Sequence, residues 1–372
     1  MKKIGAFSTG FIIVVCIAAF LYFHIGKAAS DTSYLSYEFE NCLYFDSLST
    51  EDKDIYRMFY DLVMHKDEKG YARRVTLGRF EYAAKKDDYL NVYHAMVQDH
   101  PEFFFLDGIE ERSLEVRGIE TGFFSVLSFR LGPGRADENE MIAKFERAAD
   151  DFLKCIDLTK TDPEIELQIH DKLIDTVMYD YDLEKKDLEE CDLGHTAYGA
   201  LVADSNGLRN RAVCDGYAKA FQYLLQRAGI CAAYVSGEAT CESTSLSEQG
   251  SHAWNIVRLD DGWYEVDCCW DDINPPPDDA DDVFYSAIKY EPQYYKATHH
   301  WYNRTTQQMK DLSADNGAAI RVQQGSAFYE LDRCKRSTHV RKKSADGEET
   351  GPYDFLNRYL PMADGTKYSL KQ

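Results

Sequence analysis

The sequence predicts a fold of mixed helices and antiparallel strands, on the evidence of one amphipathic helix and one hairpin. Residues 214–227 predict the helix, because their apolar side chains form one stripe at helical spacing: Tyr217, Ala220, Phe221, Leu224 and Leu225. Gly229 then provides a helix stop signal. Two runs rich in Trp, Ile, Val and Tyr, residues 252–259 and 263–270, flank Asp-Asp-Gly, which is typical of a hairpin.

The elements before this core are expected to be mainly helical. Residues 49–100 carry a helical pattern that opens with a capping box. Residues 101–131 are instead aromatic and β-branched, which favours strands. Helices are expected again at 138–158 and 163–180, and the second includes His170, which we interpret as a packed helix residue.

The amino terminus carries the features of a membrane segment. Lys2 and Lys3 precede an uncharged stretch, residues 4–23, and ~20 such residues are long enough to span a bilayer. We expect a single-pass anchor in the cell membrane with the protein outside, because more lysines precede the stretch than follow it. The alternative is secretion after cleavage near Ala28-Ala29-Ser30.

The charge of the chain excludes one class of partner. The whole chain carries a net charge of −22, and the part after residue 27 carries −25, since residues 1–27 contain three lysines and no acidic residue. Nucleic acid binding requires a basic surface, so no nucleic acid partner is expected.

The cysteines leave the redox state open and give no metal motif. Eight remain besides Cys16 and Cys214, which permits up to four disulfides, or free thiols in a reducing habitat: Cys42, Cys155, Cys191, Cys231, Cys241, Cys268, Cys269 and Cys334. No CxxC occurs. The acidic loop 271–282 lacks the EF-hand spacing, and the adjacent pair His299 and His300 alone is a poor metal motif. We therefore expect no metal and no cofactor.

Three residues carry the chemistry of a thiol enzyme. Cys214 is placed in the first turn of its helix, where unpaired N–H groups and the positive dipole end stabilise a thiolate. Gly216 is expected to permit close approach of an acyl substrate. His252 and Asp267 share a face of the hairpin if its loop has an even number of residues. In that geometry Asp267 orients the imidazole, and His252 activates the thiol.

Four further residues are candidates for the surroundings of this site. Tyr179 or Tyr181 is a candidate oxyanion donor beside the Cys214 backbone N–H, and Asn255 is a third, although strand packing explains Asn255 equally well. Trp254 is a candidate for the cleft wall. Core packing is expected for at least one of the hairpin tryptophans.

The same segments resemble a known family. VCDGYAKAF, HAWN and WYEVDCCWDD are similar to the three motif blocks of the transglutaminase-like superfamily, in its bacterial secreted or membrane-anchored branch. The resemblance covers roughly residues 160–300 and implies an α+β, papain-like core with the cysteine helix packed on an antiparallel sheet. It implies Cys214 as nucleophile, His252 as base and Asp267 as orienting acid. Cys268 and Cys269 depart from the family pattern.

The predicted organisation has four parts. Residues 1–27 are the anchor or signal peptide, 28–158 a stalk and mainly helical region, 159–302 the catalytic domain and 303–372 a C-terminal extension, loosely ordered from Asp332. The expected function is extracytoplasmic acyl transfer on peptide or protein amides, as a peptidase or deamidase or as an amide cross-linker, with a substrate associated with the cell wall. The alternative is a catalytically silent peptide- or wall-binding module.

Overall fold

The computed structural model describes most of the chain. It covers residues 33–65, 75–79, 86–106, 114–120, 125–131, 137–181, 183, 193–202, 210–242, 247–273, 292–313, 319–324, 327–332, 334, 336–342 and 354–369. Within these ranges no helix has the length and apolar character needed to cross a membrane. The predicted anchor at residues 4–23 and most of the acidic loop 271–282 lie outside the described residues.

The chain divides into two compact units, and the first lies within residues 1–38, 48–96 and 111–135. It contains helix α3 (Thr50–Met64), most of α4 (Lys86–Asp99) and a short 3-10 helix, η1 (Ser33–Ser36). Its antiparallel sheet has the order β1-β3-β2, formed by β1 (Val75–Arg79), β2 (Leu114–Glu120) and β3 (Ser125–Leu131). The helical prediction for residues 49–100 is confirmed for α3 and α4, whereas residues 75–79 form a strand.

The start of α3 follows from its sequence. The Ser49 side chain accepts a hydrogen bond from the backbone N–H of Asp52, which satisfies one of the free donors of the first turn. Behind this cap, one face of α3 is buried against the unit, through Ile55, Met58, Phe59 and Leu62. The Phe59 ring meets Phe129 of β3 edge to face at 5.0 Å. Helix and sheet of the first unit therefore share one apolar core.

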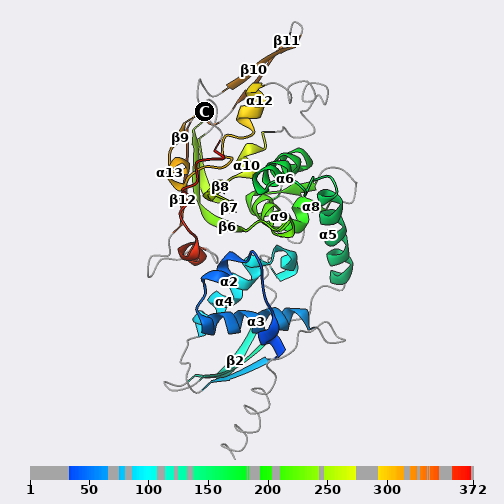
Figure 1. Ribbon diagram of the computed structural model, residues 1–372, viewed down its shortest axis with the longest axis vertical. Helices are drawn as coiled ribbons and strands as arrows, with labels where there is room; N and C mark the ends of the chain where they lie inside the picture. Colours follow the sequence, from blue (N-terminus) through cyan, green and yellow to red (C-terminus); the bar gives the residue numbers. More distant parts are fainter. Residues whose placement is uncertain are drawn as a thin grey trace, which may run out of the picture. The chain divides into compact units, whose positions relative to one another are not determined.

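The second unit is built on a five-stranded antiparallel sheet of order β8-β7-β6-β12-β9 (Figure 1). Its strands are β6 (Ala232–Glu242), β7 (Ser247–Leu259), β8 (Gly262–Val266), β9 (Leu312–Ser313) and β12 (Arg336–Arg341). Helices α5 (Glu138–Leu153), α6 (Asp162–Thr176), α8 (Ala197–Leu201) and α9 (Cys214–Arg227) complete the core. This is the α+β arrangement, with the cysteine helix on an antiparallel sheet, that the sequence predicts.

Helix α9 is the centre of this core. Tyr217, Phe221 and Leu224 are buried in one apolar cluster together with Val257 and Val266 of the sheet. The helix ends where predicted, because Gly229 adopts a φ of 87°, a left-handed conformation that glycine tolerates best. Burial of a side chain of this size contributes about 1.5–3 kcal/mol, so the apolar stripe fixes α9 on the sheet.

Shorter elements lie among the described residues of the second unit. They are α2 (Leu43–Ser47), η2 (Pro101–Leu106), β4 (Val177–Tyr179), β5 (Asn210–Ala212), α10 (Cys268–Asp271), α12 (Pro292–Ala297), α13 (Thr306–Met309), the hairpin β10 (Ala319–Gln324) and β11 (Ala327–Asp332), and η4 (Asp354–Tyr359). Strands β4 and β5 pair in parallel.

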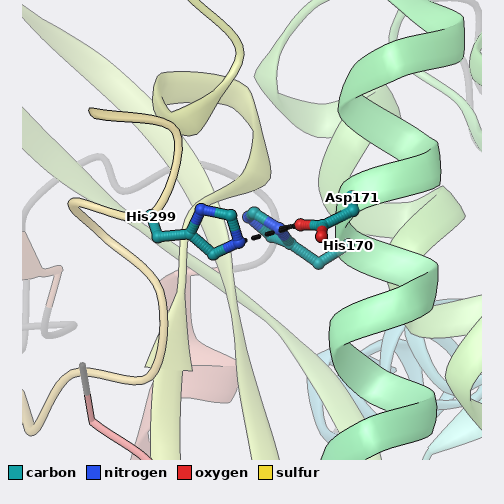
Figure 2. Close-up of side chains that lie close together, drawn as sticks. All are labelled: His170, Asp171 and His299. Atoms are coloured by element: carbon teal, nitrogen blue, oxygen red, sulfur yellow. Dashed lines mark hydrogen bonds and ion pairs between the residues drawn. The ribbon is translucent and has the colours of Figure 1, made fainter. Parts of the chain in front are cut away.

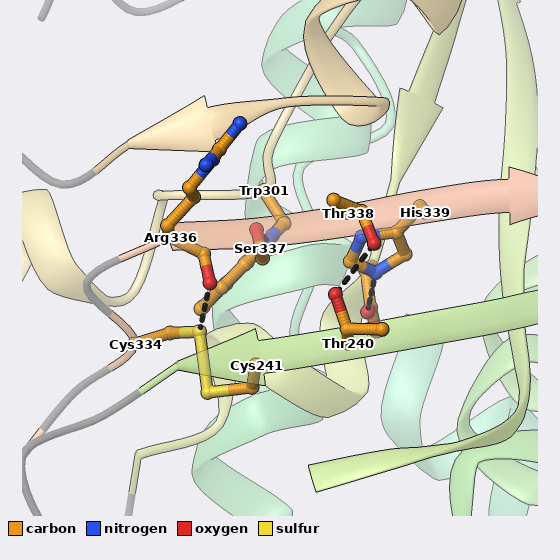
Figure 3. The surroundings of a disulfide bond; sticks show 9 residues. Thr240, Cys241, Trp301, Cys334, Arg336, Ser337, Thr338 and His339 are labelled. Atoms are coloured by element: carbon orange, nitrogen blue, oxygen red, sulfur yellow. Dashed lines mark hydrogen bonds and ion pairs between the residues drawn. A yellow bond between two sulfur atoms is a disulfide. The ribbon is translucent and has the colours of Figure 1, made fainter. Parts of the chain in front are cut away.

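The carboxyl-terminal segment differs from the loosely ordered extension that the sequence suggests. Strand β12 pairs along β6 from Arg336↔Glu242 to Arg341↔Gly237 and lies inside the main sheet. A disulfide between Cys241 and Cys334 ties the two segments together at one end of this pairing (Figure 3). The sequence does not predict this strand, because the basic side chains of β12 break the apolar alternation that is typical of a strand.

Candidate functional site

Cys214 is the first residue of α9, as the sequence predicts, with Val213 at the N-cap position. Strand β5 delivers the chain to this point, and its last residue, Ala212, pairs with Tyr179 of β4. The Cys214 side chain is half-buried and packs against Ala218, Tyr234 and Ala253. A thiolate here faces the unpaired N–H groups of the first helical turn, which stabilise negative charge.

The loop of the hairpin has an even number of residues, which His252 and Asp267 need in order to lie on the same face. Leu259 pairs with Gly262, so only Asp260 and Asp261 form the loop. His252 and Asp267 are consequently diagonal neighbours beyond the last pair of the two strands, and His252 Nε2 lies 2.7 Å from Asp267 Oδ2. Asp267 itself is placed differently from the prediction. It follows β8 as the N-cap of α10, where its Oδ1 accepts a hydrogen bond from the Trp270 backbone N–H at 3.1 Å.

A second histidine binds the same carboxylate, and sequence reasoning missed it. His339 of β12 places Nε2 at 2.9 Å from Asp267 Oδ2, the oxygen that also contacts His252. Both His339 and Asp267 are fully buried. The Asp267 carboxylate is therefore fixed in place by three contacts, one to each imidazole and one to a backbone N–H. In the sequence, only the presence of a histidine in the C-terminal segment could have indicated this contact.

The surroundings shift the pKa values of His252, Asp267 and His339 in different directions. Burial on its own would lower the pKa of His252, but Asp267 and a hydrogen bond with Cys214 raise it to about 10. Burial would raise the pKa of Asp267, but the two imidazoles hold it well below its usual range. For His339, burial lowers the pKa, and Asp267 only partly opposes this. His252 is therefore the cationic partner of the Asp267 carboxylate, and His339 is its neutral donor.

Two tryptophans flank the His252 ring in different ways. Trp254 is buried, stacks at 6.2 Å from the ring, and donates its Nε1–H to Glu265 Oε2 at 2.7 Å. It supports His252 from within the core rather than lining a cleft. Trp270 is only partly buried and lies 4.9 Å from the same ring. Trp270 is thus the better placed of the two to shield the histidine from water.

The remaining predicted site residues have distinct environments. The Asn255 amide is buried and donates to the carbonyl oxygens of Ala218 and Ala233, which ties α9 to the sheet. Tyr179 is the last residue of β4 and pairs with Ala212, the last residue of β5. Tyr181 is 67% exposed, and its ring lies 4.9 Å from that of Tyr179. Backbone hydrogen bonds account for Asn255, whereas Tyr179, which pairs with Ala212, stays an oxyanion candidate.

The residues after Cys214 anchor the first turn of α9. Asp215 places Oδ2 at 2.7 Å from His195 Nδ1, and its Oδ1 accepts a hydrogen bond from the Tyr234 hydroxyl. A Cβ on Gly216 would lie 2.7 Å from the Gly194 carbonyl oxygen. The chain's own backbone thus occupies the space at Gly216 that was expected to admit a substrate. These contacts hold the first turn of α9 in position.

The other cysteines lie in different environments from Cys214. Burial raises the pKa of Cys231 to about 12, and it raises those of Cys268 and Cys269 well above their ordinary values. These three are therefore protonated thiols at neutral pH. Cys155 is exposed and free, whereas Cys241 and Cys334 are paired. A half-buried thiol beside an imidazole is found only at Cys214 among the cysteines that the structure describes.

Comparison with known proteins agrees with this geometry. Residues 154–268 match the family model of the transglutaminase-like superfamily, and this segment contains Cys214, His252 and Asp267. The chain therefore contains a domain of the transglutaminase-like superfamily.

The other two comparisons add little. One similar solved structure is the crystal structure of a TGase, with 12% sequence identity over 58% of this chain and 56% of that chain, at a TM-score of 0.24. A likeness of this degree carries no argument. No curated protein matches the chain.

Proposed function

We propose that this protein is a thiol-dependent acyl-transfer enzyme that acts on peptide or protein amides outside the cytoplasm. The observation that carries the proposal is the 2.7 Å contact between His252 and Asp267, next to a cysteine that begins a helix. Because the imidazole is cationic and in hydrogen-bonding contact with Cys214, the thiol is supplied with the partner that a thiolate–imidazolium pair needs.

The reaction then follows from these three groups. The Cys214 thiolate attacks the amide carbonyl carbon, and the resulting oxyanion is stabilised by the Cys214 backbone N–H, with Tyr179 as a second candidate donor. His252 gives its proton to the departing amine as the C–N bond breaks, which leaves a thioester. His252 next removes a proton from water or an acceptor amine, whose attack breaks the C–S bond and restores the thiolate. Asp267 stays ionised throughout and keeps the imidazole oriented.

The acceptor decides which enzyme this is. Water as acceptor gives a peptidase or deamidase, and a lysine amine gives an amide cross-linker. The strongly acidic chain, with a net charge of −22, favours basic protein substrates through electrostatic attraction. The amino-terminal apolar stretch supports a cell-surface location, where substrates associated with the cell wall are within reach.

The pH dependence of alkylation of Cys214 tests the proposal without knowledge of the substrate. The full-length protein in detergent is treated with iodoacetamide between pH 5 and 9, and labelling of each cysteine is followed by peptide mass spectrometry. Cys214 should react well below pH 8, and the His252→Ala variant should lose this reactivity. The exposed Cys155 is an internal control, because its labelling should be the same in both proteins.

The same samples separate the two function classes. Equally slow labelling of Cys214 in both proteins, or a Cys214 paired with another cysteine, would exclude the catalytic function and favour a silent binding module. A labelled primary amine, offered together with glutamine-containing peptides, distinguishes cross-linking from hydrolysis in the active protein.

A further inference from the structure

A second cluster of histidine and carboxylate side chains lies apart from Cys214. His170 and Asp171 are consecutive residues of α6, and His299 comes from the segment after α12 and points toward them (Figure 2). Asp171 Oδ1 lies 3.0 Å from His170 Nδ1 and 2.8 Å from His299 Nε2. One nitrogen or oxygen atom from each of the three residues lies within 4.8 Å of the other two. Two imidazoles thus converge on a single carboxylate oxygen.

The outer nitrogen of each imidazole is already engaged. His299 Nδ1 lies 2.8 Å from the Tyr295 carbonyl oxygen, which accepts hydrogen bonds only, so this nitrogen carries a proton. His170 Nε2 lies 3.2 Å from Asp271 Oδ2, whose partner oxygen accepts from the Trp301 backbone N–H. Burial on its own would lower the pKa of His170, but Asp171 and Asp271 raise it to about 9, so in the metal-free protein the His170 Nδ1–H donates to Asp171. With both rings neutral, the two inner nitrogens would instead direct lone pairs at the Asp171 oxygen.

That arrangement is repulsive unless a positive charge lies between the three atoms. His299 Nε2 is buried and makes no geometrically acceptable hydrogen bond, although it is 2.8 Å from the carboxylate oxygen. With both imidazoles neutral, the three side chains carry only the negative charge of the Asp171 carboxylate, which one added proton would cancel. A divalent cation would also place positive charge between the three atoms and would use both lone pairs.

We propose that His170, Asp171 and His299 bind a divalent transition-metal ion of the zinc class. Imidazole and carboxylate are ligands of such ions, at ~2.0–2.2 Å from the metal. Ligand atoms at those distances, separated by angles of about 90–109°, lie ~2.8–3.5 Å from one another. The separations of the two imidazole nitrogens from the Asp171 oxygen, 2.8 and 3.0 Å, fall in this range. A carboxylate or carbonyl behind each ligating imidazole is the support that metal-bound histidines usually have.

The site has an access route and a structural connection. The Asp171 side chain is 43% exposed, whereas both imidazoles are almost fully buried, so an ion enters past Asp171 and keeps open coordination positions there. Asp271, behind His170, ends α10, and Asp267 is the N-cap of the same helix. The metal would thus fasten α6 and the segment after α12 to the short helix that carries the candidate acid. The sequence predicts no metal, and this site revises that expectation.

Zinc binding to the full-length protein tests the site. Protein is stripped with a chelator, dialysed to equilibrium with Zn²⁺ and analysed for bound metal, and its melting temperature is recorded with and without zinc. We expect one tightly bound zinc per chain and a rise in melting temperature, since binding to the folded state alone stabilises it. Asp171→Asn, a substitution at a partly exposed position, should weaken zinc binding at least tenfold.

Two control variants make the result specific. His65→Ala removes a histidine whose side chain is half exposed, and His252→Gln removes one from the other histidine–carboxylate cluster. Both should keep the zinc affinity of the parent protein. Absence of binding in the parent, binding unchanged in Asp171→Asn, or binding lost in His252→Gln would each overturn the proposal. None of these measurements depends on the reactivity of Cys214, so the two proposals fail independently.

Discussion

Among the described residues, the second unit holds two clusters of two histidines and one aspartate, and the clusters differ in the burial of the acid. In the first, Asp267 is fully buried and accepts contacts from the Nε2 atoms of His252 and His339 on one oxygen. In the second, Asp171 is partly exposed, and the outer nitrogens of His170 and His299 are held by other groups. In both clusters two imidazole nitrogens meet one carboxylate oxygen, so the clusters differ in the burial of that carboxylate and in the groups behind the imidazoles.

This difference shows why similar residues suit different chemistry. A buried carboxylate that holds an imidazole in the cationic form prepares it for proton transfer to and from a nearby thiol, and His252 is in hydrogen-bonding contact with Cys214. Imidazoles whose outer nitrogens are fixed by a carboxylate and a carbonyl are prepared to offer lone pairs to a cation. Burial of the acid and the groups that hold the outer nitrogens, rather than composition, separate the two sites.

The largest expected effect is the loss of a carboxylate from the buried cluster. Asp267→Asn leaves the His252 charge buried without its partner, and breaking such a pair costs about 3–5 kcal/mol. Asp171→Asn, in metal-free protein, should cost no more than about 1 kcal/mol, because that side chain is screened by water. Urea denaturation of the two variants measures both values. Equal destabilisation would show that the two acids are not in different environments.

A smaller effect is expected when β12 loses its covalent tie. Replacing both Cys241 and Cys334 with serine removes a cross-link between residues 93 positions apart and should cost about 2–4 kcal/mol. Because β12 carries His339 but no residue of the second cluster, Cys214 alkylation at pH 6 should slow, whereas zinc affinity should stay at the parent value. Parallel loss of both would indicate general unfolding instead.

The stability of the first cluster should depend on pH with a definite sign. The folded pKa of His252, about 10, exceeds its unfolded value of ~6.5, so its contribution is complete below about pH 6.5 and declines as pH rises through 10. The difference in unfolding free energy between the parent and His252→Gln should fall by about 2–3 kcal/mol between pH 7 and 9. Denaturant melts at several pH values give this difference. A difference that grows over this range would contradict the assignment.

The smallest effect concerns His339 as a positioning residue. His339→Leu removes a donor to Asp267 and should slow Cys214 alkylation at pH 6 about tenfold, which corresponds to ~1.4 kcal/mol. His339→Gln retains an N–H donor and should restore most of the rate. Val340→Ala, at the exposed neighbour on the same strand, is the matched control. Equal loss in the leucine and glutamine variants would assign His339 a packing role only.

The sequence predicts the local geometry of the first cluster well, because that geometry depends on nearby residues. The helix start at Cys214 follows from apolar spacing, and the two-residue loop places His252 and Asp267 on one side of the hairpin. Tertiary pairing decides the rest. His339 joins Asp267 across 72 positions, and His299 reaches α6 from more than 100 positions away, so no local pattern announces either contact. The position of Asp267 at the start of α10 could have been predicted, because aspartate is a preferred N-cap residue.

The titration of His252 tests the central claim most directly. Histidine-labelled protein, with the His252 resonance assigned by comparison with His252→Gln, is followed by NMR from pH 5 to 10.5 in the parent and in Cys214→Ala. If Cys214 and His252 form an ion pair, His252 stays protonated past pH 8 in the parent, and its pKa falls in the alanine variant. A His252 that titrates near pH 6.5, or at the same pH in both proteins, would contradict the account.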